Sequence, residues 1–261
     1  RPGLALDLGS VTDDAANTLE LSDAELSSIS AATLRMGDGT SGITISAPLN
    51  AEGAGRMWLK SNGGLSQTAP LSQTWLIAEV AGLLVLDDAN DVEMVALAST
   101  TSSIVFRDVD GFVAIRTDGQ PAVNSPFGSV TLTSLAGLLE VSASSMTNSL
   151  VAAGPVTINA EGDDAKFRLG TLGTLRGGST VTITADKMEL AGSISASGQI
   201  VTLRPWESAE TMVLGSITDT AANTLELSDA ELDRITAGTL RIGGSLTGAI
   251  TISQALTPAV T

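Results

Sequence analysis

Carboxylates are the side chains with the greatest chemical potential in this sequence, because the chain contains no His, no Cys and no Tyr. Its 29 Asp and Glu residues fall partly in short clusters, of which Asp108-Val109-Asp110-Gly111 is the strongest. Carboxylates spaced in this way can supply oxygen ligands to Ca²⁺. However, the cluster matches neither the EF-hand spacing nor the glycine-rich calcium-binding repeat. We therefore favour solvated turn residues, with Asp108 and Asp110 as the calcium candidates of the alternative interpretation.

The same composition argues against catalysis. Nucleophilic triads and thiolate chemistry need His or Cys. Glycoside hydrolysis needs two carboxyl groups that face one cleft, and the 13 Lys and Arg residues are too scattered to assist a lyase. We expect no catalytic residue, which leaves a polysaccharide-active enzyme as the weakest alternative. Trp58, Trp75 and Trp206 could stack on sugars, but filling gaps near the core or at a corner is the favoured interpretation.

One glycine pattern matches the dinucleotide-binding fingerprint, at Gly37-Asp-Gly-Thr-Ser-Gly42. That fingerprint requires a helix directly after the glycines, whose amino end holds the pyrophosphate. Here the strand-like Ile43-Thr-Ile-Ser46 follows, and Asp38 would repel a phosphate. The sequence therefore predicts a turn at this place and no cofactor.

The net charge of −16 restricts the partners. Binding to nucleic acid requires Lys and Arg to neutralise phosphates, and anionic membrane surfaces attract basic segments, so both are disfavoured. The best apolar run, from Trp75 to Leu86, contains Glu79 and is too short to span a bilayer. We expect no nucleic-acid partner and no membrane insertion in this segment.

A long internal repeat is the most informative feature. Residues Leu8 to Gly42 and Leu214 to Gly248 align without gaps at an offset of 206 and are identical at 24 of 35 positions. The chain thus holds one repeat, residues 1–206, and the start of the next, residues 207–261, with no linker or change of composition between them. We interpret residues 1–261 as one continuous domain, cut from a longer tandem array.

Short strand-like runs fill the repeat. Val130-Thr-Leu-Thr, Val156-Thr-Ile-Asn and Val181-Thr-Ile-Thr share one form and follow one another at nearly equal spacing. This spacing predicts an all-β fold, a parallel β-solenoid of about 25 residues per coil in which each coil buries its apolar face against the next. An antiparallel β-sandwich is the alternative fold.

Two places interrupt the strands at equivalent positions of the repeat. Ser22-Asp-Ala-Glu25 and Ser228-Asp-Ala-Glu231 fit the capping box, in which the Ser side chain and the Glu side chain each bind a free amide. We expect a single helical turn at a corner of the solenoid in each case. Asn17 and Asn223 precede the next strands, and their side chains are predicted to satisfy backbone groups at a turn.

The repeat style resembles that of filamentous-haemagglutinin-type exoproteins, giant bacterial β-strand-repeat proteins of the two-partner secretion type. The segments that carry the resemblance are VTITADKMELAGSISASGQIVTLRP, from residue 181, and TLELSDAELDRITAGTLRIGGSLTGAITI, from residue 224. The resemblance implies a right-handed parallel β-helix, export to the extracellular space or the outer-membrane surface of a Gram-negative bacterium, and a role in adhesion, biofilm or cell contact. It implies no catalytic residue.

Together these observations predict a structural or adhesive shaft. The alternative is a face for carbohydrate or a receptor along that shaft, which the sequence does not distinguish from the first function. The predicted partners are further copies of the same repeat, joined covalently or end to end, and host or matrix polysaccharide. Since neither end of the sequence carries a charged or amphipathic cap, we expect both ends to continue into further coils.

Overall fold

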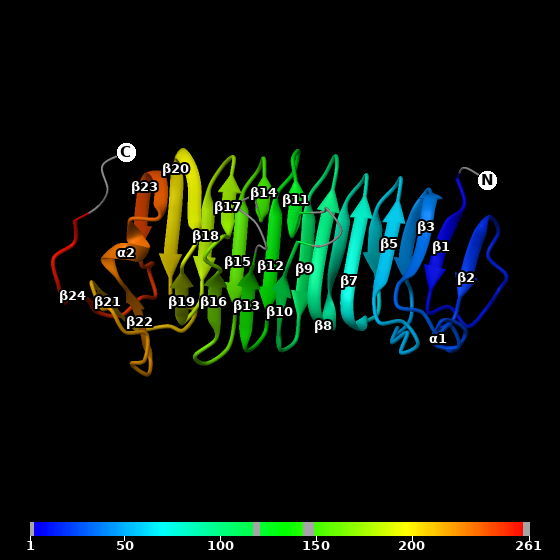
Figure 1. Cartoon of the computed structure of the whole chain (residues 1–261), viewed down its shortest axis with the longest axis horizontal. Coiled ribbons are helices and arrows are strands. Elements are labelled where there is room, and N and C mark those ends of the chain that lie inside the picture. The colour runs from blue at the N-terminus through cyan, green and yellow to red at the C-terminus, as the bar shows by residue number, and fades with distance from the viewer. Residues whose placement is uncertain (1–2, 117–120, 143–148, 258–261) are drawn as a thin grey trace.

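A computed structural model describes residues 3–116, 121–142 and 149–257 of the chain. This part consists of β-strands and two helices of five and four residues. The strands stack into an elongated body with the two ends of the chain at opposite ends (Figure 1). No helix in the described ranges is long and apolar enough to cross a membrane.

The strands form three parallel ladders, one for each face of the solenoid. Ladder 1 consists of β1 (Ala5–Leu8), β4 (Gly42–Ile45), β6 (Leu65–Gln67), the start of β8 (Leu84–Ser99), β9 (Ile104–Asp108), β12 (Val130–Ser134), β15 (Val156–Ala160), β18 (Val181–Thr184), and the second halves of β20 (Ser193–Arg204) and β23 (Ile235–Ile242). Ladder 2 consists of the middle of β8, β10 (Gly111–Ala114), β13 (Leu138–Val141), β16 (Lys166–Leu169) and β19 (Lys187–Leu190).

Ladder 3 closes the coil. It consists of β3 (Leu34–Thr40), β5 (Met57–Ser61), β7 (Ser72–Val80), the end of β8, β11 (Val123–Ser125), β14 (Leu150–Ala152), β17 (Thr174–Gly177), and the first halves of β20 and β23. The long strands β8, β20 and β23 therefore bend around corners and serve more than one ladder each. The all-β, parallel solenoid predicted from the sequence is confirmed, whereas its right hand stays a prediction.

Apolar and polar residues alternate along each strand, so that one side of the strand faces the core and the other faces the outside. In β12, β15 and β18 the first and third residues point inward and are buried, and the Thr between them lies outside. Stacked coils bring like residues together, so that Val130, Val156 and Val181 are direct neighbours in the register. Each fully buried Val or Leu contributes about 1.5–3 kcal/mol, which makes the stack the main source of stability.

Coil length is shorter on average than the sequence predicts. Equivalent inward positions of ladder 1 lie at Ile43, Leu65, Leu84, Ile104, Val130, Val156, Val181 and Val201. The step from Leu65 to Leu84 is the shortest of these, and the average is about 23 residues per coil. The longer value predicted from the sequence came from the central coils, which have longer corner loops than the coils on either side.

The sequence repeat folds into a local unit that interrupts the regular coil. Module 1, residues 5–45, contains β1, β2 (Thr18–Leu21), α1 (Asp23–Ser27), β3 and β4. Module 2, residues 211–252, contains β21 (Thr211–Leu214), β22 (Thr224–Leu227), α2 (Asp229–Leu232), β23 and β24 (Ile250–Ile252). In each module the second strand directly follows the first in the sequence and pairs parallel to it, as at Leu6 and Leu19. A short return loop thus replaces a whole coil.

The two modules occupy different faces of the solenoid. Met36 of module 1 belongs to ladder 3, whereas its counterpart Ile242 belongs to ladder 1. In the same way β4 belongs to ladder 1, whereas β24 follows β21 and β22 in a separate sheet that lies beside β19 of ladder 2. From a residue of module 1 to its counterpart in module 2, the chain therefore makes eight complete coils and then continues onto the next face of the solenoid. Module 2 is also one residue longer between Ile242 and Ile250 than module 1 is between Met36 and Ile43.

Candidate functional site

The calcium candidates lie at the end of β9. Asp108 is fully buried, and its carboxylate accepts the backbone N–H groups of Val92 at 2.8 Å, Gly111 at 3.0 Å and Asp110 at 3.2 Å. Burial outweighs these bonds and raises the pKa of Asp108 to about 6. Asp110 is exposed on the following turn. Asp108 thus ties two coils together through backbone amides, a role that differs from the solvated turn residue expected from the sequence.

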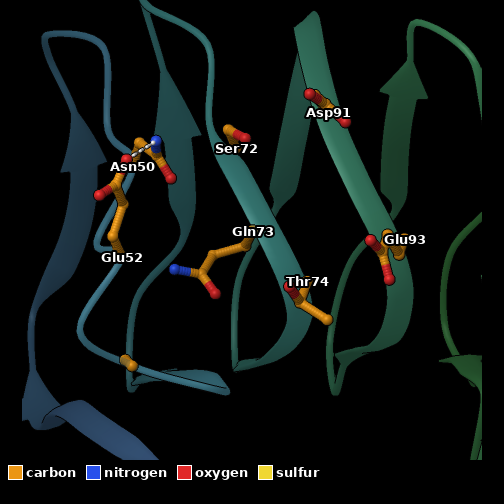
Figure 2. A pocket seen from close by; sticks show the side chains of 8 residues that line it. Asn50, Glu52, Ser72, Gln73, Thr74, Asp91 and Glu93 are labelled. Atoms are coloured by element: carbon orange, nitrogen blue, oxygen red, sulfur yellow. Dashed lines mark hydrogen bonds between the residues drawn. The ribbon is translucent and has the colours of Figure 1, made fainter. Parts of the chain in front are cut away.

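A shallow polar groove crosses three successive coils near module 1 (Figure 2). It is lined by Asn50 and Glu52 from the loop before β5, Ser72, Gln73 and Thr74 from β7, and Asp91 and Glu93 from β8. Gln73 donates from its amide to Ala51 O at 3.1 Å, and Asn50 donates to Glu52 Oε1 at 3.1 Å. The groove offers carboxylate, amide and hydroxyl groups, with which it can hydrogen-bond to the hydroxyls of a sugar chain.

In two of the three Trp residues, the guanidinium group of an Arg side chain stacks on the indole ring. Arg35 lies 4.5 Å from the ring centroid of Trp58, and Arg56 lies 4.0 Å from that of Trp75. Both residues are half-buried and alternate with buried inward neighbours, Leu59 and Leu76, so they lie on the outer side of their strands and do not fill gaps in the core. Trp206 is 42% exposed at a hollow lined by Arg204 and Leu246.

Among the described residues, no group of three or more Asp and Glu side chains is arranged to hold a metal ion. The Gly37–Gly42 pattern leads into the strand β4, as the sequence predicts. In place of the predicted turn, however, Gly37–Thr40 belong to β3, where the positive φ angles of Gly37 and Gly39 accompany a shift of register.

The helical turns of the two modules contain the predicted capping boxes. Ser22 Oγ accepts the N–H of Glu25 at 3.3 Å, and the Glu25 carboxylate accepts the N–H of Ser22 at 2.9 Å. Ser228 and Glu231 repeat this geometry at 3.3 and 2.9 Å. Equal distances at the two ends of the body show that the four-residue motif folds in the same way in different surroundings.

The Asp inside each motif connects the helical turn to the following coil. Asp23 Oδ1 accepts the N–H of Asn50 at 2.7 Å. Asp229 accepts the N–H and the hydroxyl of Thr257 at 2.8 and 2.6 Å. The Ser-Asp-Ala-Glu motif therefore does more than cap a helix, because its Asp also fixes the next coil.

Asn17 and Asn223 act through their backbone conformation. Their φ angles are +58° and +50°, in the left-handed region that Asn tolerates better than most residues. The Asn17 carbonyl accepts the N–H of Ala5 at 3.0 Å, and the Asn223 carbonyl accepts the Thr211 hydroxyl at 3.3 Å. Each Asn turns the return loop into the second strand of its module.

A buried Glu, which the sequence reasoning missed, holds the return loop of each module. Glu20 accepts the Ser10 hydroxyl at 2.7 Å and the N–H of Ala15 at 2.6 Å. Its counterpart Glu226 accepts the Ser216 hydroxyl at 2.6 Å and the N–H of Ala221 at 2.8 Å. Both copies of the repeat have a Ser and a Glu at these equivalent positions, and this agreement could have revealed the contact from the sequence.

These bonds favour the ionised carboxylates. The hydrogen bond from Ser10, followed by that from Ala15, lowers the pKa of Glu20. Burial of Glu226 opposes ionisation, but the bonds from Ser216 and Ala221 prevail and lower its pKa as well. The loop lies on the outside of the strands, where it has no core to pack against, so a charged acceptor supplies its anchorage.

Module 2 has a further set of contacts, with the shaft below it. Lys187 Nζ in β19 donates to the carbonyls of Ala221 and Thr224, the latter at 2.9 Å, and lies 3.3 Å from Asp164. Lys166 Nζ lies 3.2 Å from Asp219 Oδ2. These lysines looked scattered in the sequence because their partners come from a distant part of the chain.

A carboxyl pair lies beside these contacts. Asp186 is buried and accepts the N–H groups of Trp206 and Glu207 at 2.8 and 3.0 Å. Burial, together with a hydrogen bond to Asp186 and the charge of that group, raises the pKa of Glu210 to about 9. Glu210 therefore keeps its proton at neutral pH.

Comparison of the chain with protein-family models, with curated proteins and with solved structures finds no match.

Proposed function

We propose that this chain is a segment of the shaft of a long repetitive protein of the filamentous-haemagglutinin type, with a structural or adhesive role and no catalysis. The observation that carries the proposal is the way in which module 2 continues the stack. The shaft beneath it contributes Lys166 and Lys187, and the module adds new strands in line with the old ones. A sequence that repeats in this way can add coils by the same rule indefinitely.

The proposed shaft has a definite pitch and a definite rotation. Eight coils and one face at roughly 4.8 Å per coil give about 40 Å for each repeat. Each module would be turned by one face relative to the module before it. Any feature carried by the repeat would then follow a threefold spiral, and the fourth module would return to the face of the first.

The proposed location is the extracellular space or the outer-membrane surface of a Gram-negative bacterium. The absence of Cys and the acidic composition are compatible with export, and the resemblance of the repeat to exoproteins supports it. The net charge of −16 would keep neighbouring shafts apart.

The proposed partners are further copies of the repeat, joined covalently or end to end. Apolar strand residues are exposed at both ends of the described body, at Leu19 on one side and at Ile250 and Ile252 on the other. Sedimentation at micromolar concentration is expected to show association that increases with salt, because salt screens the repulsion between acidic bodies. A monomer that is indifferent to salt would contradict end-to-end association.

Chains with one, two and three copies of residues 1–206, each followed by residues 207–261, test the shaft itself. Electron microscopy is expected to show rods of constant width whose length grows by about 40 Å for each added repeat. Rods that do not lengthen, or that thicken as repeats are added, would contradict the proposal.

A second candidate function is binding of a matrix or host polysaccharide in the groove of Figure 2. The groups that favour it are the amides and carboxylates that line the groove on three successive coils. Titration with acidic and neutral polysaccharides is expected to show binding to a neutral chain that weakens in Thr74→Ala and Glu93→Gln. Val11→Ala, which lies outside the groove, is the matched control. Equal binding by all variants would exclude the groove.

A further inference from the structure

One side of module 1 exposes groups whose counterparts are covered in module 2. Leu19 is 52% exposed, whereas Leu225, the same residue one repeat later, is completely buried. Asp13 is exposed, whereas its counterpart Asp219 forms the ion pair with Lys166. The two modules have nearly the same sequence, so this difference comes from their neighbours.

Module 2 shows what covers this side. Strand β22 lies beside β19, and Leu225 is enclosed there together with Met188 and Leu190. Lys187 binds carbonyls of the return loop and of β22. The backbone N–H of Leu190 donates to Glu231 Oε1 at 3.0 Å, so that α2 is held by the preceding coil as well as by the following one.

We infer that the side of module 1 formed by β2 and α1 is a docking surface for a solenoid coil with the chemistry of residues 162–190. That coil brings two lysines on successive turns, an apolar interior and a free strand edge. In module 1 the lysines would meet Asp13 and the carbonyls of Ala15 and Thr18, and the strand edge would meet Glu25. This inference rests on the proposed function, because it names the contact between successive repeats of the shaft.

Charge and availability decide which coil can occupy the surface. The loop of module 1 carries Asp13 and Asp14, which favour a basic partner. A separate molecule of this chain cannot supply Lys166 and Lys187 in the required form, since they are already engaged with its own module 2. The full set of lysine and apolar contacts therefore requires a copy of these coils in another repeat of the same polypeptide, whereas end-to-end association of separate molecules would use the apolar contacts alone.

Extending the chain by its own coils tests the inference. A copy of residues 155–206 placed directly before residue 1 keeps the register of the repeat. The chain has no Cys, so that Leu19→Cys introduces a single thiol. Reaction of this thiol with a soluble reagent is expected to be at least ~10-fold slower in the extended chain than in the original one, because local opening must precede it.

Two matched variants control the experiment. Val11→Cys reports on the outer loop, because Val11 is 90% exposed and its counterpart Ile217 stays exposed in module 2, so the reaction rate of this thiol is expected to be unchanged. In the second variant, the substitutions Lys166→Glu and Lys187→Glu are made in the added copy only. They are expected to restore the fast reaction of the thiol at residue 19. Hydrogen exchange of the backbone amides tests the same contact without any substitution. In the extended chain, the amides of Thr18–Leu21 are expected to exchange as slowly as those of Thr224–Leu227.

The outcomes separate the inference from the function on which it rests. Added coils whose own amides are protected while residues 18–21 still exchange rapidly would overturn the docking surface and leave the shaft intact. Added coils that stay unfolded would overturn both. Slow reaction that persists in the Glu variant would show that apolar contact alone covers the surface, and would overturn the role of the lysines.

Discussion

Modules 1 and 2 place nearly the same sequence in two different environments. In module 1 the coil that follows covers the inward residues of β4, so that Ile43 is 2% exposed, while β2 is open on the other side. In module 2 the arrangement is reversed: β22 is covered by the preceding coil, while Ile250 in β24 is 48% exposed. Each module therefore shows the contacts that the other lacks. Burial in a solenoid is a property of neighbouring coils as much as of the residue itself.

Other features do not respond to the neighbours at all. The capping boxes have the same hydrogen bonds in both modules, and so do the carboxylates of Glu20 and Glu226. The turn glycines Gly9 and Gly215 both adopt positive φ, at +92° and +87°. In these shared bonds the partners are close together in the sequence, so the module supplies them itself, whereas the additional bond from the Leu190 N–H to Glu231 comes from a neighbouring coil.

The largest difference is expected for one substitution made at both copies of a leucine. Leu225→Ala leaves a cavity between β22 and β19 and is expected to lower the free energy of unfolding by about 2–5 kcal/mol. Leu19→Ala, at a half-exposed site, is expected to cost about 1 kcal/mol or less. Urea unfolding measures both values. Equal losses would mean that the two modules have the same surroundings in solution.

The buried ammonium group is expected to have the next largest effect. Lys187→Met keeps the apolar stem but leaves two carbonyls of module 2 without a donor, at a cost of about 1–3 kcal/mol. Lys166→Met is the control, because its ion pair is partly exposed and is worth about 1 kcal/mol or less. Hydrogen exchange of the return loop measures the effect locally. No change in the loop would show that Lys187 does not hold module 2.

A loss of stability with rising pH is expected beside module 2 but not beside module 1, because Glu210, which directly precedes module 2, corresponds to Leu4 before module 1. The folded chain keeps the Glu210 proton up to a pH of about 9, whereas the unfolded chain loses it near 4.5. Folding therefore takes up a proton between these values, and stability falls as the pH rises through this window.

Glu210→Gln removes that proton uptake. The melting temperature of the variant is expected to vary less between pH 5 and pH 9 than that of the original chain. Glu207→Gln, at an exposed neighbour, is the control and should keep the original slope. Parallel profiles for the original chain and Glu210→Gln would contradict the raised pKa of this group.

Small losses of stability, similar in both modules, are expected when the Glu that binds the return loop is replaced. Glu20→Gln and Glu226→Gln each weaken the bonds from the return loop. Because the pKa of each folded carboxyl lies below its unfolded value, the stabilisation is present above that value and is lost as the pH falls through the folded pKa. Exchange of the loop amides at pH 7 and pH 3 tests this, and a response in one module only would break the equivalence.

No effect is expected from removal of calcium. The Asp108 carboxylate already accepts hydrogen bonds from the backbone N–H groups of Val92 and Gly111, so its oxygens are not free to bind calcium. The contacts of both modules are likewise made by protein groups. Addition of EDTA should change the melting temperature by less than about 1 °C, whereas bound metal would add stability by mass action. A large decrease would point to a metal site that involves the Asp108–Asp110 turn.

The sequence by itself determined the features that depend on near neighbours. The alternation within Val130-Thr-Leu-Thr and its two evenly spaced relatives predicted stacked parallel strands. Ser22 with Glu25 predicted the helical turn, since a capping box is complete within a single turn of helix. The composition predicted the lack of thiolate and His chemistry for the same reason: it requires no knowledge of distant contacts.

Only the tertiary structure decided which strand lies beside which. The extra strand β2 has the same alternation as any other strand, and its pairing with β1 depends on a loop that is tied back by Glu20. The roles of Lys187 and Asp108 were hidden because their partners lie on other coils, which are reached only after a complete turn. The rotation of module 2 by one face depends on the summed lengths of all the corner loops between the copies, and no local pattern records that sum.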